Sequence, residues 1–305
     1  MKVLIATEKP FAPEAVNGIR EIIEQANYEL ALLENYNDKS ELLAAVADVD
    51  AIIIRSDKIT REVMDAAKQL KIVVRAGAGY DDVGLAAATE EGVTVMNTPG
   101  QNSNAVAELA LGMMVLKARN KYSGKAGTEL KDKNLGIHAY GNVGRLVGNI
   151  AKGFGMKIFA FDPFVDKSSI EKDGVTALDS VEALYEKCQY ISLHIPANDK
   201  TKNSINYNLL NLMPQNGTLV NTARKEVVDE DGLLKLMEDR NDIGYLSDIA
   251  PDARETFEQK YSDRVFFTPK KMGAQTAEAN INAGLASANQ IVGFLKNGVT
   301  TYKVN

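Results

Sequence analysis

Short apolar runs alternate with amphipathic stretches along the whole chain, and this alternation limits its fold more than any other feature. Strands rich in Val and Ile that are separated by helices are typical of a parallel sheet with helices on both faces. The stretches 12–26, 40–48 and 60–69 have helical spacing. The apolar runs of the first block are KVLIAT (2–7), YELALLE (28–34), AIIIRS (51–56), KIVVRAGAG (71–79) and VTVMNTP (93–99).

A second alternating block follows a long apolar helix expected over 103–120 and a lysine-rich linker at 131–134. A last helix is expected over 274–298, with Asn297 and Gly298 as its stop signal. A length of 305 residues suits two such α/β units. The apolar runs of the second block are NLGIHAY (134–140), MKIFAFDP (156–163), QYISLHIP (189–196), GTLVNTA (217–223), IGYLSDI (243–249) and RVFFTP (264–269).

Composition excludes several classes of protein. The net charge is −6 and no run concentrates Lys and Arg, so we expect no nucleic-acid partner. The single cysteine, Cys188, cannot form an internal disulfide, and no Cys/His spacing indicates a metal site. The first apolar run is too short for a signal peptide, and no apolar segment approaches 18 residues, so we expect no membrane partner. A cytoplasmic location is the default expectation.

The stretch IHAYGNVGRLVG (137–148) nearly matches the dinucleotide-binding pattern G-x-G-x-x-G. Gly141 and Gly144 occupy the second and third glycine positions, which let the backbone approach a pyrophosphate and let the helix pack on the strand. Ala139 occupies the first position. We expect its methyl group to exclude positive φ at little cost without blocking the phosphate. A helix that begins near Asn142 would direct its first N–H groups at the pyrophosphate.

The surroundings of this turn favour NAD as the cofactor. An apolar strand precedes the turn, and Asp162 ends the next strand, near the spacing of a carboxylate that binds ribose hydroxyls. A carboxylate at that position repels a 2′-phosphate, which disfavours NADP. The alternative is an ordinary α/β unit whose glycines serve packing alone. We interpret His138, inside the strand, as a residue of the core or of a pocket wall rather than as a catalytic residue.

Five further stretches make the chain resemble the D-isomer-specific 2-hydroxyacid dehydrogenases, and within them the phosphoglycerate branch. The resemblance covers nearly the whole chain, with the motifs in the family's order. The stretches are RAGAGYDDVGLAAATEEGVTVMNTPGQNS (75–103), ISLHIPANDKT (191–201), NTARKEVVDEDGLL (221–234), SDIAPD (247–252) and KMGAQT (271–276).

The resemblance implies the domain organisation. Two doubly wound parallel-sheet domains are expected, with a Rossmann-type NAD-binding domain (99–278) inserted into a flavodoxin-like substrate domain (1–98 plus 279–305). Family active sites lie in the cleft between the two domains. The resemblance also implies a homodimer formed through the nucleotide domain, which suits the apolar helix at 104–117, and leads us to expect no C-terminal regulatory domain.

The resemblance assigns roles residue by residue. Arg224 matches the arginine that binds the substrate carboxylate, for which a guanidinium fork is suited. The cofactor pyrophosphate is expected at Asn142 and Val143 beside Gly141 and Gly144, and the ribose at Asp162. Residues expected near the remaining parts of NAD are His194 and Pro196 (adenine), Thr222 and Ala223 (nicotinamide), Asp248 (carboxamide), Gly273 and Ala274. Residues expected to face a phosphorylated substrate are Arg55, Ser56, Arg75, Gly77 and Ala78.

The acid–base group departs from the family pattern. The family has Pro-His-Leu-Gly-Ala and a paired glutamate, whereas this chain has PKKMGA (269–274) and Ala253 at the glutamate's position. Alignment from Gly273 places Lys271 on the histidine, and alignment from Pro269 places Lys270 there; we prefer Lys271. A lysine base must lose a proton, so desolvation and neighbouring cations would help it, whereas a carboxylate partner would raise its pKa.

The resemblance implies NAD-dependent oxidation of a small anionic substrate, D-3-phosphoglycerate, to 3-phosphohydroxypyruvate in serine biosynthesis. Two alternatives stay open at this point. One is a dehydrogenase or reductase for another D-2-hydroxy acid, such as glycerate or hydroxypyruvate. The other is a catalytically inactive module that binds NAD(H), which the altered turn and the missing His/Glu pair would suit.

Overall fold

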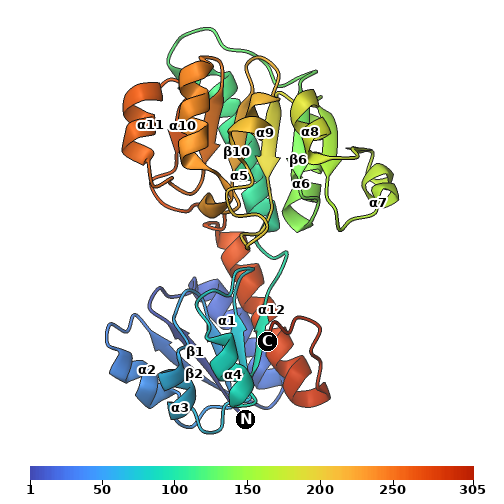
Figure 1. Ribbon diagram of the computed structural model, residues 1–305. Helices are drawn as coiled ribbons and strands as arrows, with labels where there is room; N and C mark the ends of the chain where they lie inside the picture. The colour runs from blue at the N-terminus through green and yellow to red at the C-terminus, as the bar shows by residue number, and fades with distance from the viewer. The chain divides into compact units, whose positions relative to one another are not determined.

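The computed structural model describes residues 1–305 and divides into two compact units, each an α/β sandwich (Figure 1). The first unit contains 1–102 and 276–305, and the second contains 103–275. The second unit is therefore an insertion in the chain of the first. None of the helices combines the length and the apolar character that a membrane span requires.

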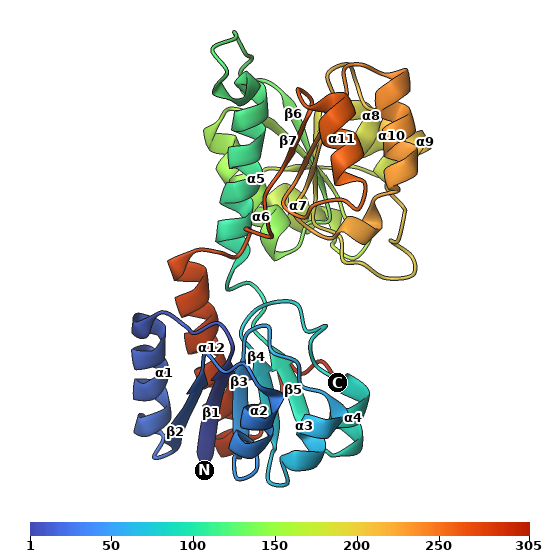
Figure 2. The ribbon, with the colours of Figure 1, turned by 90° about the vertical axis from the view of Figure 1, so that its left-hand side faces the viewer.

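The first unit has five parallel strands in the order β2-β1-β3-β4-β5, which is the flavodoxin-like order. The strands are β1 (Lys2–Thr7), β2 (Glu29–Glu34), β3 (Ala51–Ile54), β4 (Ile72–Arg75) and β5 (Thr94–Asn97). The helices are α1 (Pro13–Gln25), α2 (Lys39–Ala45), α3 (Arg61–Ala66), α4 (Leu85–Glu90) and α12 (Ala277–Asn297). Helices α1 and α12 cover one face of the sheet and α2, α3 and α4 the other (Figure 2).

Alternate strand residues of the first unit enter two separate cores. Val3 and Ile5 pack toward α1 and α12, whereas Leu4 and Ala6 pack toward α2, α3 and α4. Strands that are buried on both faces need apolar residues at every position, so the sequence shows continuous apolar runs rather than alternating apolar and polar residues. Helix α12 ends as predicted, with Gly298 in the left-handed conformation (φ +66°) and its N–H bonded to the Phe294 carbonyl.

The second unit has seven parallel strands in the order β12-β11-β10-β9-β6-β7-β8. The chain runs outward from β6 through β7 to β8, returns to β9, and then runs outward on the other side, which is the Rossmann arrangement. The strands are β6 (Asn134–His138), β7 (Lys157–Phe161), β8 (Thr176–Ala177), β9 (Tyr190–Leu193), β10 (Thr218–Asn221), β11 (Gly244–Ser247) and β12 (Val265–Phe267). Strand β8 was not predicted from the sequence, because it has only two residues and lies at the sheet edge.

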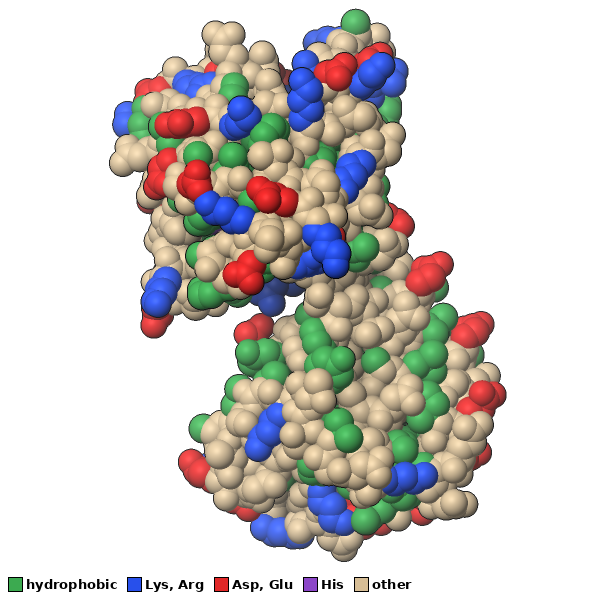
Figure 3. Space-filling model, turned by 90° about the vertical axis from the view of Figure 1, so that its right-hand side faces the viewer, with side chains coloured by type: hydrophobic (Ala, Val, Ile, Leu, Met, Phe, Trp, Pro, Cys, Tyr) green, Lys and Arg blue, Asp and Glu red, His purple; other side chains and the backbone are tan.

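Helices cover both faces of this sheet as well. Helices α5 and α6 share one core with Leu135, Ile137 and Val220, while α8, α9, α10 and α11 share the other with Ile191 and Leu219 (Figure 2). The helices are α5 (Ser103–Ala118), α6 (Asn142–Gly153), α7 (Lys167–Lys172), α8 (Val181–Lys187), α9 (Tyr207–Asn211), α10 (Glu230–Asp239) and α11 (Arg254–Tyr261), with 3₁₀ turns η1 (Asn120–Tyr122) and η2 (Lys225–Val227). Basic and acidic side chains intermix on the face of this unit seen in Figure 3.

Candidate active site

The turn between β6 and α6 has the geometry of a dinucleotide-binding turn. Helix α6 begins at Asn142, with Gly141 as an extended N-cap residue (φ −84°, ψ −155°). A methyl group on Gly141 would meet no atom within 4 Å, so the space over the first helical N–H groups is open. A methyl group on Gly144 would lie 2.4 Å from the Ala139 carbonyl oxygen, so this glycine lets α6 lie directly against the end of β6. Such a helix start can stabilise an anion.

The backbone conformation of Ala139 contradicts one expectation drawn from the sequence. Its φ is +80°, so the alanine adopts the positive φ that we expected its methyl group to exclude. Hydrogen bonds to the neighbouring strand hold the turn in this form: the Ala139 N–H donates to the Phe161 carbonyl (2.9 Å), and the Tyr140 N–H donates to Asp162 Oδ2 (2.8 Å). A residue with a side chain costs about 1–2 kcal/mol in the left-handed region, so the turn carries local strain.

Asp162 lies directly after β7, where the sequence predicts a ribose-binding carboxylate. Its Oδ2 accepts the Tyr140 N–H and its Oδ1 accepts the Phe164 N–H, both at 2.8 Å. Each carboxylate oxygen can accept about two hydrogen bonds, so both oxygens keep capacity for hydroxyl groups. Asp162 therefore joins the β6–α6 turn to the β7–α7 loop, and its contact with ribose stays a prediction.

The two histidines of the chain lie together at the carboxyl ends of β6 and β9, where the strand order reverses. The His194 N–H donates to the His138 carbonyl at 2.9 Å. His138 Nδ1 lies 3.3 Å from the Tyr185 hydroxyl, and His194 Nε2 lies 2.9 Å from Ser192 Oγ. Burial lowers the pKa of His138 to about 4, and burial together with the neighbouring His138 lowers the pKa of His194 to about 3. Both rings are therefore neutral at pH 7.

The turn after β10 contains three predicted site residues and one that the sequence analysis missed. The missed residue is Asn221, which is fully buried: its Oδ1 accepts the Ala223 N–H and its Nδ2 donates to the Arg224 carbonyl, both at 2.9 Å. Thr222 is 7% exposed, and its buried Oγ1 has no hydrogen-bond partner. Asn221 thus fixes the turn that carries Thr222, Ala223 and Arg224. An asparagine at a strand end commonly stabilises a turn, which is the signal that could have identified it.

Asp248 lies directly after β11 and is fully buried. Its Oδ1 accepts the Met272 N–H (2.7 Å) and the Thr268 hydroxyl (3.0 Å), and its Oδ2 accepts the Gly273 N–H (2.7 Å). Both carboxylate oxygens therefore hold the segment that contains the two candidate lysines. The predicted contact between Asp248 and a carboxamide stays a prediction.

Lys270 and Lys271 are both exposed. The resemblance predicts that Ala253 takes the place of the family's glutamate, and two acids near Ala253 have other partners. Asp252 forms an ion pair with Lys225 at 2.5 Å, and Glu230 accepts the backbone N–H groups of Asp252 and Ala253. Glu230 therefore holds the chain just before α11, and the Asp252 carboxylate is occupied by Lys225.

The predicted substrate residues of the first unit lie at the carboxyl edge of its own sheet. Arg55 is half-buried: its Nη1 donates to the carbonyls of Lys9 (3.0 Å) and Pro10 (2.8 Å), and its Nη2 donates to Asn280 Oδ1 (2.6 Å). Its guanidinium also lies 5.2 Å from the centre of the Phe11 ring. Arg55 thus joins the β1–α1 loop to α12, and only part of its hydrogen-bonding capacity is left for a substrate. Ser56, the next residue, is exposed.

Arg75 lies directly over the backbone of Gly77. A methyl group on Gly77 would be 1.5 Å from Arg75 Nη1, and the φ of Gly77 is +148°. The loop is held at its next residue, because Asn97 Nδ2 donates to the Ala78 carbonyl at 2.6 Å. Glycine at position 77 is therefore required both by its backbone conformation and by the place of the Arg75 side chain.

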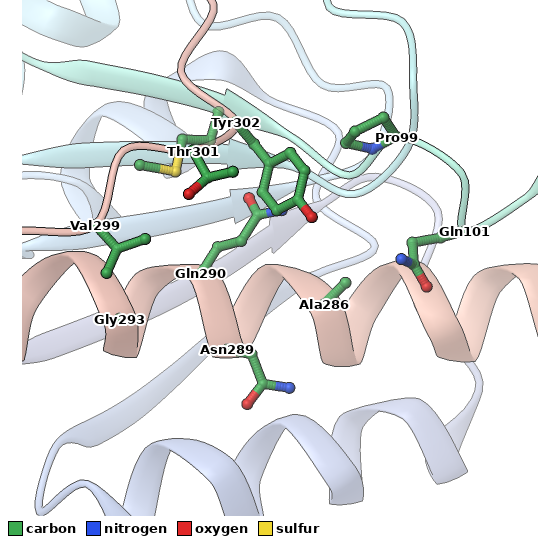
Figure 4. A pocket seen from close by; sticks show the side chains of 10 residues that line it. Pro99, Gln101, Ala286, Asn289, Gln290, Gly293, Val299, Thr301 and Tyr302 are labelled. Atoms are coloured by element: carbon green, nitrogen blue, oxygen red, sulfur yellow. The ribbon is translucent and has the colours of Figure 1, made fainter. Parts of the chain in front are cut away.

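A cavity of about 290 Å³ elsewhere in the first unit is not the predicted site, because none of the predicted substrate residues lines it. Its wall is formed by α12, the segment after it, β5 and the residues after β5. Figure 4 shows Gln290 rising from α12 toward Thr301 and Tyr302. The Gln290 amide is tied to the fold, since its Nε2 donates to the Asn97 carbonyl at 3.0 Å.

The second unit fits a bound dinucleotide on the structural evidence alone. The space over Gly141 is open, the strand order reverses between β6 and β9 beside it, and Thr222 has a buried hydroxyl without a partner. In sheets of this type ligands bind outside the carboxyl ends of the strands at this reversal. Residues 104–269 also match the family described as "D-isomer specific 2-hydroxyacid dehydrogenase, NAD binding domain". The chain belongs to the D-isomer-specific 2-hydroxyacid dehydrogenase family.

Individual relatives agree with this assignment. The chain is 35% identical over 286 residues to D-3-phosphoglycerate dehydrogenase of Methanocaldococcus jannaschii, covering 88% of this chain and 54% of that protein. It is 34% identical over 281 residues to hydroxypyruvate reductase of Thermotoga maritima, covering 86% and 90% respectively. The chain thus spans about half the length of the first of these relatives.

A solved structure extends the similarity to the whole chain. The NAD+-bound 3-phosphoglycerate dehydrogenase of Entamoeba histolytica matches with a TM-score of 0.90 and 46% identity, covering 100% of this chain and 98% of that one. The match confirms the predicted fold class, two parallel-sheet α/β domains of the 2-hydroxyacid dehydrogenase type. The prediction of NAD as cofactor is confirmed as well, since the second unit is the family's NAD-binding domain.

Proposed function

We propose that this protein catalyses the NAD-dependent oxidation of D-3-phosphoglycerate to 3-phosphohydroxypyruvate, the first step of serine biosynthesis. The observation that carries the proposal is the similarity of the whole chain to the Entamoeba histolytica phosphoglycerate dehydrogenase at 46% identity. The relative from Methanocaldococcus jannaschii bears the same name. The arginines that the sequence predicts to bind an anionic substrate, Arg224, Arg55 and Arg75, support the same proposal.

The proposed cofactor contacts follow the geometry of the second unit. Gly141, Asn142 and Val143, at the start of α6, would bind the pyrophosphate, and Asp162 the ribose. The turn at Thr222 and Ala223 would lie along the nicotinamide. Further proposed contacts are Gly144, His194, Pro196, Asp248, Gly273 and Ala274. NAD+, when bound, accepts the hydride that leaves C2 of the substrate.

Each remaining task of the oxidation is assigned to one group of the chain. Arg224 binds the substrate carboxylate and polarises the carbonyl as it forms. Lys271, as the neutral amine, accepts the hydroxyl proton and becomes an ammonium; in the reverse direction the ammonium returns it. Arg75, Gly77 and Ala78, with Arg55 and Ser56, are proposed for the phosphate end.

Substitution of the lysines tests the acid–base assignment. Lys271→Ala should reduce kcat at least 100-fold in both directions, the usual contribution of a positioned acid or base. Lys270→Ala should have a smaller effect, and Lys260→Ala, on the exposed face of α11, serves as the matched control. Because an unperturbed lysine has a pKa of about 10.4, the chemical step of oxidation should accelerate toward alkaline pH. Near wild-type turnover in both Lys270→Ala and Lys271→Ala would refute the assignment.

A second candidate substrate is unphosphorylated hydroxypyruvate or glycerate. The Thermotoga maritima hydroxypyruvate reductase favours it, since 34% identity extends over 90% of that protein. The deciding experiment follows NADH absorbance with 3-phosphohydroxypyruvate and with hydroxypyruvate. We expect at least a 100-fold higher kcat/KM for the phosphorylated compound. A preference for hydroxypyruvate would establish the second candidate. Tight NADH binding without turnover of either compound would indicate the inactive NAD(H)-binding module.

Dimerisation through the second unit is part of this proposal. Helix α5 keeps several apolar side chains only half-buried, among them Leu109, Val115 and Leu116. A second copy would cover them. Light scattering after gel filtration should give twice the 33.1 kDa chain mass, and Leu116→Glu should shift the protein toward the monomer. A monomeric wild-type protein at 50 μM would contradict the dimer.

A further inference from the structure

The two candidate lysines lie on a segment that begins and ends on one buried carboxylate. Thr268 precedes the segment Pro269–Lys271, and Met272 and Gly273 follow it. The Thr268 hydroxyl lies 3.0 Å from Asp248 Oδ1 and 2.8 Å from the Asp248 carbonyl oxygen. The N–H groups of Met272 and Gly273 donate to Oδ1 and Oδ2, each at 2.7 Å. The segment is therefore closed into a loop by side-chain and backbone bonds to a single residue.

The anchors of this loop belong to the rigid part of the second unit. Asp248 follows β11 and Thr268 follows β12, and these strands pair in the sheet. Asp248 is fully buried and Thr268 is 4% exposed. A methyl group on Gly273 would lie 3.0 Å from Asp248 Oδ2, so a glycine is what lets this N–H approach the carboxylate closely. Hydrogen bonds to a buried charged group are strong, because an unmade one would leave a desolvated charge without a partner.

We propose that Asp248 and Thr268 act together as positioning residues for the acid–base lysine. The proposal rests on the proposed function, which assigns proton transfer to this loop. A lysine side chain is long and flexible, and its amine can reach only positions within a fixed distance of its own backbone. Movement of that backbone therefore moves the whole region that the amine can reach. Position 253, where the sequence analysis places the family's glutamate, is an alanine. The Asp248 carboxylate instead holds the loop that carries the lysine, through the Thr268 hydroxyl before it and the Met272 and Gly273 N–H groups after it.

Thr268 allows a clean test, because no predicted contact with substrate or cofactor involves it. Thr268→Val keeps the shape and removes the hydroxyl, and Thr268→Ser keeps the hydroxyl. A reacting group misplaced by about 1 Å can lose about 100-fold in rate. We expect Thr268→Val to lower kcat at least tenfold in both directions with the KM for NAD+ within twofold of wild type. Thr268→Ser should restore kcat to within threefold.

Two readouts separate positioning from chemistry and from a failure of the proposed function. Hydrogen exchange on the protein without ligands should be at least tenfold faster at the Met272 and Gly273 amides in Thr268→Val and near wild type in Thr268→Ser. The alkaline rise of the oxidation rate should keep its midpoint in Thr268→Val and disappear in Lys271→Ala. Wild-type kcat in Thr268→Val, with Lys271→Ala inactive, would overturn the positioning role and leave the proposed function standing. Absence of turnover in the wild-type protein would refute the proposed function instead.

Discussion

The buried histidine pair makes the second unit sensitive to mild acid, in a pH range where few other groups titrate. The ordinary pKa of histidine is about 6.5 and those of Asp and Glu lie near 4, so histidines dominate between pH 5 and 7. The chain has no histidines other than His138 and His194. Burial is the main cause of the lowered pKa of both, about 4 for His138 and about 3 for His194.

The sign of the effect follows from proton uptake. Below pH 6.5 the unfolded chain binds protons on both histidines while the folded unit does not, so acid favours unfolding. The contribution of each ring is fully present above pH 6.5 and is lost as the pH falls toward the folded pKa. One pKa unit corresponds to about 1.4 kcal/mol, so His138 should lower the free energy of unfolding by about 2 kcal/mol between pH 7 and pH 5. His194, whose pKa is lowered as well, should make a contribution of similar size over the same range.

Two measurements on the full chain test this expectation. The two histidine ring resonances in an NMR titration should not shift between pH 7.5 and 5. Denaturant unfolding followed by circular dichroism should show the loss of stability, and His138→Asn should remove about 2 kcal/mol of the difference between pH 7 and 5. Asparagine is chosen because its amide can replace Nδ1 beside the Tyr185 hydroxyl. Ring resonances that titrate near pH 6.5, or equal acid sensitivity in His138→Asn and wild type, would refute the reasoning.

Three glycine and alanine positions give further predictions. Ala139→Gly should raise the free energy of unfolding by about 0.5–1 kcal/mol, because φ is +80° there; an unchanged denaturation midpoint would show that the turn is not strained. Gly144→Ala should weaken NADH binding at least tenfold in a fluorescence titration, since its methyl group would lie 2.4 Å from a carbonyl oxygen, while Gly153→Ala in the same helix, with open space, should bind normally. Gly77→Ala must displace Arg75 and should raise the KM for the phosphorylated substrate at least tenfold in steady-state assays; an unchanged KM would exclude Arg75 from substrate binding.

The fold could be predicted because its signals are local. Strands buried on both faces must be apolar throughout, and the helices between them must carry one apolar face, so both patterns can be read from short stretches. Helix α12 ends at the predicted stop because Gly298 adopts a left-handed conformation that other residues resist. Strand β8 escaped detection because its two residues pair only with β7 at the sheet edge, and so short a segment has no periodicity.

The supporting contacts of the site could not be predicted, because they join residues far apart in the sequence. From the sequence, Arg55 looks like an unpaired cation at the end of a strand, but in the structure its guanidinium donates to Asn280 on the last helix. The bond between Thr268 and Asp248 likewise depends on the pairing of β11 with β12 and leaves no pattern in the sequence. The expectation for the φ angle of Ala139 was wrong for a different reason. The intrinsic preference of alanine is for negative φ, but the hydrogen bonds from the β6–α6 turn to β7 outweigh it.

The residues found at the proposed acid–base position are consistent with one another in physical terms. A histidine that accepts a proton benefits from a carboxylate that stabilises its cation, whereas the same carboxylate would hold a lysine in its protonated form and remove the base. A chain with lysine at this position therefore gains from the absence of an acid at position 253, and it must orient the side chain by other means. The Met272 and Gly273 N–H groups, bonded to the buried Asp248 carboxylate, hold the backbone next to Lys271 in place. The alanine at position 253 and the proposed acid–base role of Lys271 are therefore compatible, and the bonds from Asp248 to Met272 and Gly273 hold the chain beside that lysine.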